Sequence, residues 1–136
     1  RLILKNKKRC LCSCVETVFI LLLYLYISTY KGENMEGTEL IAFNIIAAVG
    51  TARSNYIAAI DAAAEGNFDE AEKLIKEGQD AYVEGHDAHA KLLTQTAQGD
   101  KVIMDLLLTH AEDQLMSAEG FGILAERFVT LYKKLG

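Results

Sequence analysis

The chain has no proline among its 136 residues, so no position in it forbids a long α-helix. From Thr38 onward, apolar side chains recur every three or four residues, which is the spacing that gathers them on one face of a helix. Glycine-containing breaks interrupt this spacing twice. We therefore predict an all-α fold with helices at about 38–65, 69–96 and 101–135, joined by short connections into an antiparallel up-down-up three-helix bundle.

The two breaks also carry residues that suit helix ends. The first has Gly66, which suits a helix C-terminus, followed by Asn67, which with Glu70 three residues later resembles a capping box. The second has Gly99 and then Asp100, which we predict to be the N-cap of the third helix. The chain should reverse direction at both places.

The first two predicted helices each have one apolar face. On the first helix this face consists of Ala42, Ile46, Val49, Ile57, Ile60 and Ala64. On the second it consists of Ala71, Leu74, Ile75, Gly78, Tyr82, Leu92 and Leu93. Gly78 and Gly85 lack a β-carbon and should let a neighbouring helix approach closely.

Residues 1–34 differ in composition from residues 35–136. The segment carries a charge of +4, which leaves −9 on the rest of the chain against an overall −5. Its apolar run, 18–27, is shorter than the roughly 20 residues of a membrane span, and no small-residue cleavage site follows it. We interpret the segment as translated upstream sequence ahead of Met35, with a membrane-associating segment and a secretory signal as alternatives. Residues 35–136 form the predicted domain.

The acidic charge of residues 35–136 limits the function classes open to the chain. A surface with an excess of carboxylates has no basic patch for nucleic-acid phosphates, so nucleic-acid binding is disfavoured. All three cysteines, Cys10, Cys12 and Cys14, lie in the first segment, and their spacing predicts neither a disulfide framework nor a zinc site. We expect a cytoplasmic protein.

The third predicted helix has an apolar stripe that is interrupted by polar residues. This interrupted stripe consists of Ile103, Leu106, Leu107, His110, Asp113, Gln114, Ser117, Phe121, Leu124, Phe128, Leu131 and Leu135. Further apolar residues widen the helix's apolar sector, which predicts neighbours on several sides and hence self-association. Polar groups at core positions are costly unless they have partners, so this interruption is the expected place for chemistry.

His110 and Asp113 are the candidate chemical residues of that interruption. At i, i+3 they share a helix face, so the carboxylate could orient the imidazole, or both could approach a metal ion or a phosphoryl group. No serine or cysteine nucleophile lies beside them, which leaves the imidazole as the candidate nucleophile for phosphoryl transfer. A satisfied buried pair with no chemical role is the alternative on periodicity alone.

The string from Leu107 to Ser117, LLTHAEDQLMS, resembles the active-site helix of the lactose/cellobiose IIA family of the bacterial sugar phosphotransferase system, which carries a His-Ala-x-Asp-x-Leu-Met core. Three further segments resemble the family in order and spacing, namely 50–54, 65–71 and 84–86. The resemblance extends over essentially all of residues 38–135.

The resemblance implies a homotrimer of three-helix subunits with the phosphorylated histidine at His110. It also implies that Asp113 faces the three-fold axis around a divalent metal ion, Mg²⁺. Three carboxylates near one axis would repel unless protonated or bound to a cation, which agrees with a hard, oxygen-liganded metal. Gln114 and Ser117 are candidates for hydrogen bonds to the phosphoryl oxygens, or they simply satisfy the polar cluster.

In such a system the phosphoryl group arrives from the histidine-containing phosphocarrier protein and leaves to a cysteine of the IIB component. The membrane IIC component recognises the sugar, so lactose, cellobiose, chitobiose and other β-glucosides all stay open. The acidic surface of this chain would complement basic patches on its partners and speed their encounter.

The sequence departs from the family at the second helix. Where many relatives have Ala-His-x-x-Gln, residues 85–89 place His86 and His89 three residues apart, which we interpret as hydrogen-bonded groove histidines rather than a metal pair. Arg53 lies in the apolar face of the first helix. We interpret it as a structural arginine, with contact to the phosphoryl group as the alternative.

Three other classes of function compete with the phosphocarrier. In a non-catalytic helical interaction module, the polar interruption would only specify the register between subunits. A histidine phosphotransfer protein of two-component signalling also uses a phosphorylatable histidine on a helical bundle, but it normally has four helices. A membrane-tethered protein that depends on residues 1–34 is a third possibility.

Overall fold

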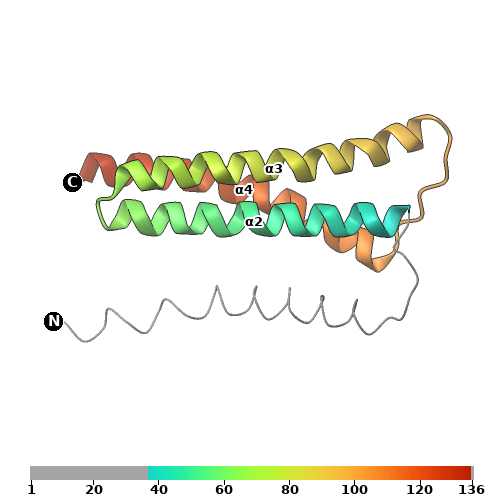
Figure 1. Ribbon diagram of the computed structural model, residues 1–136, viewed down its shortest axis with the longest axis horizontal. Helices are drawn as coiled ribbons and strands as arrows, with labels where there is room; N and C mark the ends of the chain where they lie inside the picture. The colour runs from blue at the N-terminus through green and yellow to red at the C-terminus, as the bar shows by residue number, and fades with distance from the viewer. Residues whose placement is uncertain (1–36, 136) are drawn as a thin grey trace. The chain divides into compact units, whose positions relative to one another are not determined.

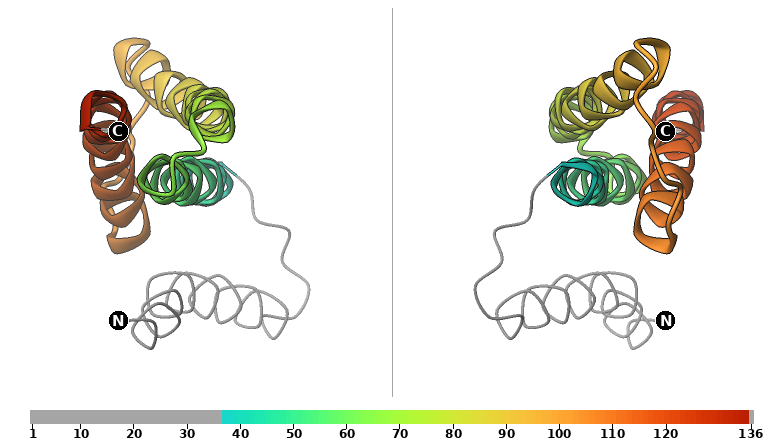
Figure 2. Two further views of the ribbon diagram at one scale, coloured as in Figure 1. Left: turned by 90° about the vertical axis from the view of Figure 1, so that its left-hand side faces the viewer. Right: turned by 90° about the vertical axis from the view of Figure 1, so that its right-hand side faces the viewer.

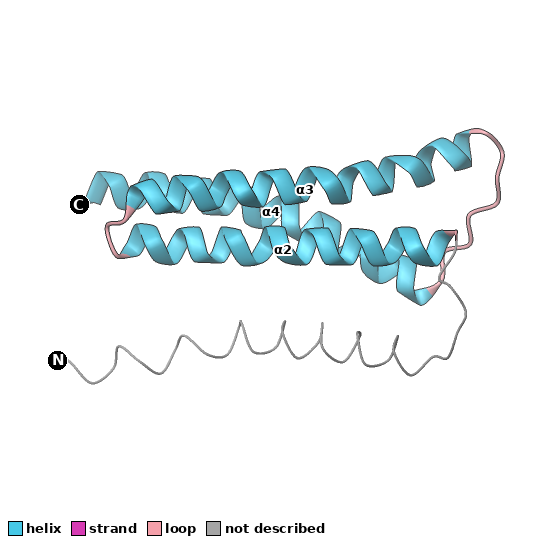
Figure 3. Cartoon of the chain, viewed as in Figure 1, coloured by secondary structure: helices cyan, strands magenta, loops and turns pink. Residues whose placement is uncertain are grey.

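The computed structural model of the chain describes residues 37–135, which form helices α2 (Thr38–Ala64), α3 (Phe68–Ala97) and α4 (Leu106–Leu135). The three helices run up, down and up, and the described residues contain no strand, as predicted (Figures 1 and 3). A fourth helix, which the signalling alternative would need, is absent from this part of the chain. The prediction for residues 1–34 concerns a segment outside the described residues.

None of the described helices is long and apolar enough to cross a membrane.

The turn between α2 and α3 is closed by backbone hydrogen bonds at the end of α2. Gly66 has a φ of 81°, and its N–H donates to the carbonyl of Ala63 at 3.0 Å. The N–H of Asn67 donates to the carbonyl of Ala62 at 2.9 Å, which completes a Schellman motif. Asn67 is the N-cap of α3 but makes no side-chain capping hydrogen bond, so the predicted capping box is wrong.

The predicted start of the third helix, Lys101, is also wrong, because α4 begins at Leu106. Gly99, with a φ of 94°, ends α3, and the chain stays non-helical through Asp105. The Asp105 carboxylate, not that of Asp100, accepts a hydrogen bond from the Leu108 N–H at 2.8 Å. Residues 100–105 are needed to lead the chain from the end of α3 to the start of α4 (Figure 3).

Helix α2 lies next to both other helices, whereas α3 and α4 contact each other less (Figure 2). Its buried residues are Ala42, Ile45, Ile46, Val49, Ala52, Tyr56, Ala59 and Ala63. The apolar face predicted for this helix is therefore buried as far as Val49. Beyond Val49, the buried residues include Ala59 and Ala63 instead of the predicted Ile57, Ile60 and Ala64. On α3, Leu93 was expected in the core but is 58% exposed.

Tyr56 of α2 is held between two glycines on the neighbouring helices. Its side chain is 3% exposed. A β-carbon added at Gly78 of α3 would lie 2.5 Å from its ring, and one at Gly122 of α4 would lie 3.0 Å from it. A β-carbon added at Gly85 would likewise lie 2.8 Å from the Val49 side chain. The prediction that Gly78 and Gly85 permit close helix approach is confirmed.

The face of α4 that packs inside the bundle is not the interrupted stripe. It consists of Leu108, Ala111, Leu115, Ala118, Ala125 and Val129. Within the interrupted stripe, Leu107 and Phe121 pack partly against the core. Leu106 is 86% exposed, and the exposed group continues with Ile103, Leu124, Phe128, Leu131 and Leu135. The interrupted stripe therefore lies mostly on the outside of the single chain, which corrects its predicted place in the core.

Candidate functional site

His110, Asp113, Gln114 and Ser117 lie together on the outward face of α4, over its first three turns. Their spacing of three, four and seven residues from His110 places them on one side of the helix. His110, Gln114 and Ser117 are partly buried, and Asp113 is exposed. The predicted grouping is thus present, but it is accessible from outside the chain.

Exposed apolar side chains lie on this face before and after the polar group. Leu106 precedes His110 by one turn, and Leu124 and Phe128 follow Ser117 at 53% and 41% exposure. Isolated exposed apolar residues are ordinary on protein surfaces, but a continuous series along one helix face is typical of an interaction surface. His110 therefore lies within an apolar surface that the rest of the described chain leaves largely uncovered.

A hydrogen-bonded pair links α3 to α4 beside this group. His89 Nδ1 and Glu112 Oε1 are 2.8 Å apart, and both side chains are 24% exposed. His89 is therefore a hydrogen-bonded histidine, which is the part of its predicted role that this contact supports. The sequence interpretation missed Glu112, although a carboxylate one residue before Asp113 on a helix that packs beside His89 was a usable signal.

His86 has a different place from His89. Its side chain is exposed. Its ring centroid lies 6.1 Å from that of Tyr82 and 6.3 Å from that of His89, and the ring is tilted relative to both. Within the part of the chain that the structure describes, no three His, Cys, Asp or Glu side chains come together as a metal site. The two histidines therefore do not form a metal pair with a third ligand there.

Arg53 extends over the face of an aromatic ring. Its guanidinium carbon lies 5.9 Å from the centroid of the Phe121 ring, which is a cation–π distance. This contact joins α2 to α4 one turn beyond Ser117. The structural interpretation of Arg53 is supported by this packing.

Two tyrosines of α2 and α3 lie near acidic side chains of α4. Burial raises the pKa of the Tyr82 hydroxyl, and the negative charge of Glu119 raises it further. Burial likewise raises the pKa of Tyr56, with Glu126 and then Tyr82 adding to the rise. Both tyrosines therefore stay neutral, and the side of α4 that faces them carries negative charge.

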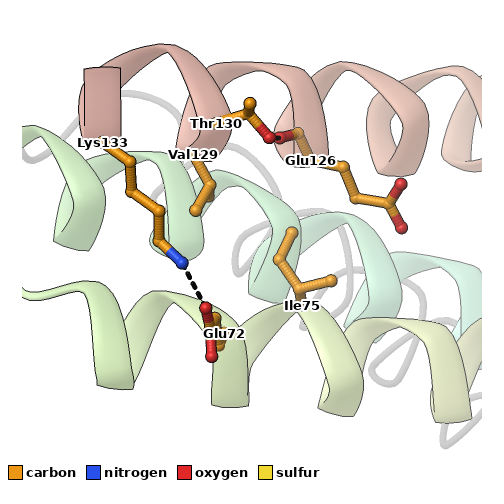
Figure 4. Close-up of a pocket in the computed structure, with 6 residues that line it drawn as sticks. All are labelled: Glu72, Ile75, Glu126, Val129, Thr130 and Lys133. Atoms are coloured by element: carbon orange, nitrogen blue, oxygen red, sulfur yellow. Dashed lines mark hydrogen bonds and ion pairs between the residues drawn. The ribbon is translucent and has the colours of Figure 1, made fainter. Parts of the chain in front are cut away.

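Two open grooves lie away from His110. One, of about 290 Å³, is lined by Glu72, Ile75, Glu126, Val129, Thr130 and Lys133. Figure 4 shows Lys133 of α4 and Glu72 of α3 reaching toward each other across it, where they form an ion pair. It begins roughly four turns along α4 from His110. The other lies between α2 and α3 and is lined by Asn44, Ala47, Ala48, Thr51, Glu84, Ala88 and Lys91.

Comparison with known proteins assigns a family to this arrangement. A family model described as "PTS system, Lactose/Cellobiose specific IIA subunit" matches residues 40–133. The chain is 37% identical over 101 residues to a lactose-specific EIIA component of the phosphotransferase system from Streptococcus mutans, covering 74% of this chain and 97% of that protein. It is 35% identical over 100 residues to a lichenan-specific phosphotransferase enzyme IIA component from Bacillus subtilis, covering 74% and 91%.

A solved structure agrees with these sequence matches. The crystal structure of a cellobiose-specific enzyme IIA from Bacillus anthracis matches with a TM-score of 0.71 and 36% identity, over 74% of this chain and 94% of that one. The chain therefore belongs to the lactose/cellobiose-specific IIA family of the phosphotransferase system, and with it to the phosphoryl-transfer machinery of sugar transport.

Proposed function

We propose that this chain is a phosphocarrier that accepts a phosphoryl group on His110 from the histidine-containing phosphocarrier protein and passes it to the IIB component during sugar uptake. One observation carries the proposal. His110 lies on the outward face of α4 with Asp113, Gln114 and Ser117, where a partner protein can reach it. A histidine buried in the bundle could not meet a donor and an acceptor in turn.

The chemistry requires little from the protein beyond position. A ring nitrogen of neutral His110 attacks the phosphorus of the donor's phosphohistidine, so one P–N bond forms as another breaks and the donor imidazole leaves with the electron pair. In the second step the P–N bond on His110 breaks and a P–S bond forms on the IIB cysteine. Gln114 and Ser117, on the same face of α4 as His110, are the neutral side chains that we propose donate hydrogen bonds to the phosphoryl oxygens.

The proposal includes assembly as a homotrimer through α4. The exposed apolar residues Leu124, Phe128, Leu131 and Leu135 repeat at spacings of three and four, which suits packing against other helices. Such packing would remove them from water and would bring the copies of Asp113 toward one another.

A magnesium ion is the cofactor that this arrangement would favour. Asp113 offers an exposed carboxylate on this face of α4, and assembly through α4 would bring the Asp113 carboxylates of several copies together as ligands. Carboxylate oxygens are the ligands that Mg²⁺ prefers, and the bound ion would supply positive charge among them.

In this role the chain would work on the cytoplasmic side of the membrane, which it would meet only indirectly, through the IIC transporter. Relatives named for lactose, cellobiose and lichenan resemble this chain to a similar degree, so the sugar stays open.

The test is the intact mass of the full chain after incubation with phosphoenolpyruvate, enzyme I and the phosphocarrier protein. We expect a gain of one acid-labile phosphoryl group per chain, lost in His110→Gln and kept in His86→Gln, the matched change at an exposed histidine on α3. No gain in the folded wild-type protein would favour the interaction module. A gain that persists in His110→Gln would move the acceptor to His86 or His89.

A further inference from the structure

We propose that His89 is a positioning residue for phosphoryl transfer, which acts through Glu112 to fix the direction in which α4 presents His110. The inference rests on the proposed function of His110. His89 lies on α3, whereas the proposed acceptor His110 lies on α4.

The contact between His89 and Glu112 is well placed for this role. The two atoms, His89 Nδ1 and Glu112 Oε1, are 2.8 Å apart, and three quarters of each side chain is covered. Since an ionised carboxylate only accepts hydrogen bonds, Nδ1 of His89 carries the proton and donates it. Glu112 lies two residues after His110 and directly before Asp113, so the contact holds α4 in the same turn as both.

Helices α3 and α4 share the apolar core, and directional polar contacts also join them. Three side-chain pairs that join the two helices form what we call the polar seam: Glu72 with Lys133, Gln79 with Glu126, and His89 with Glu112. On α4 these partners lie seven or fourteen residues apart, along one line of the helix. The His89–Glu112 pair is the member of the polar seam within one turn of His110.

Leu108 and Leu115, one turn before and one turn after Ala111, anchor α4 in the core. The buried residue next to Glu112 itself is Ala111, whose side chain is a single methyl group, so the His89–Glu112 bond adds a directional contact at this turn. A side chain at the radius of the His110 ring moves farther than the helix backbone when α4 rotates. Displacements of about 1 Å can cost about 100-fold in rate when reacting atoms must be in line.

The pair also separates two neighbouring negative charges. Glu112 and Asp113 are adjacent carboxylates, and a phosphoryl group on His110 adds further negative charge. By binding Glu112 toward α3, His89 keeps that carboxylate away from the outward face. Asp113, which is exposed, then remains on the side of His110.

The test compares single-turnover rates of phosphoryl transfer from the phosphorylated phosphocarrier protein to full-length wild type, His89→Leu, His89→Gln and Gln79→Leu. We expect His89→Leu to lower the rate at saturating donor by about tenfold, with little change in the donor concentration at half-maximal rate. The amide of His89→Gln can still donate to Glu112 and should restore most of the rate. Gln79→Leu is the matched control, because it removes the 2.7 Å bond to Glu126 from the same polar seam, farther from His110.

Three kinetic outcomes would overturn the proposal. His89→Leu could transfer as fast as wild type, or it could be slowed no more than Gln79→Leu, which would indicate general loosening between α3 and α4. His89→Gln could be as slow as His89→Leu, which would show that the hydrogen bond to Glu112 is not the route.

A measurement without phosphoryl transfer separates this proposal from the proposed function. We expect the NMR signals of the His110 ring and of the amides from 108 to 115 to shift in His89→Leu and to stay in place in Gln79→Leu. Unchanged signals around His110 in His89→Leu would refute positioning, whatever the transfer rates. A wild-type protein that accepts no phosphoryl group would refute the proposed function, and with it any positioning role for His89 in that reaction.

Discussion

The buried position of the Tyr56 ring requires that residue 78 of α3 has no β-carbon. The ring occupies the space that a side chain at Gly78 would need, and a β-carbon there would lie 2.5 Å from it. We expect Gly78→Ala to lower the free energy of unfolding by about 1–3 kcal/mol, because an enlarged side chain in a packed core forces its neighbours to shift. Urea denaturation followed by circular dichroism measures this change in the free energy of unfolding.

The control for that prediction is Gly50→Ala on α2. A β-carbon at Gly50 meets nothing within 4 Å, so the substitution should leave stability unchanged or raise it by up to about 1 kcal/mol through helix propensity. Equal stability changes in Gly78→Ala and Gly50→Ala would contradict the close packing of Tyr56.

At the scale of the element, the start of α4 depends on Asp105. Its carboxylate accepts the Leu108 N–H, one of the donors at a helix start that no residue of the helix itself can satisfy. Asp105→Ala should therefore lower the free energy of unfolding by about 1 kcal/mol, and Asp100→Ala, at the position expected from sequence, should change it little. Thermal melts of the two variants and wild type give the comparison, and a larger loss in Asp100→Ala would place the cap where the sequence suggested.

The sequence was sufficient for the number of helices and for the breaks, because Gly66 and Gly99 both have the positive φ for which glycine is suited. The start of α4 was not predictable from local signals, since Asp100 and Asp105 are both acceptable N-caps. What decides between them is the distance that residues 100–105 must cross between two helices. That distance is a property of the tertiary fold.

The inward face of α4 was mispredicted for a related reason. The helix has two apolar faces, and the one with the larger side chains points outward, while Ala111, Ala118 and Ala125 face α2. Periodicity measures which residues share a face and not which neighbour covers it. The grouping of His110 with Asp113 could therefore be predicted, but its exposure and the pairing of His89 with Glu112 required the packing of α3 beside α4.

At the scale of the whole molecule, the uncovered apolar side of α4 should determine how many chains assemble. We expect the full-length protein to have three times the 15.0 kDa mass of one chain in size-exclusion chromatography with light scattering. Phe128→Glu should reduce this to the mass of a single chain, because it introduces a charge where Phe128 is 41% exposed within the apolar series.

Val83→Glu is the matched variant for that measurement. Val83 is also an exposed apolar residue, at 55%, but it lies on α3. The Val83→Glu protein should therefore keep the wild-type mass in size-exclusion chromatography. A single-chain mass for wild type, or dissociation in both variants alike, would contradict assembly through α4.

The central place of α2 has a consequence for the order in which the protein acquires its structure. Helices α2 and α3 are neighbours in sequence and are joined by a short turn, so they can pair while few residues separate their contacts. Helix α4 leaves the ribosome after α2 and α3, and it needs α2 to cover its buried face. We expect a newly synthesised chain to form the α2–α3 hairpin before the surface around His110 exists. The chain would therefore be able to carry a phosphoryl group only after α4 has packed against α2.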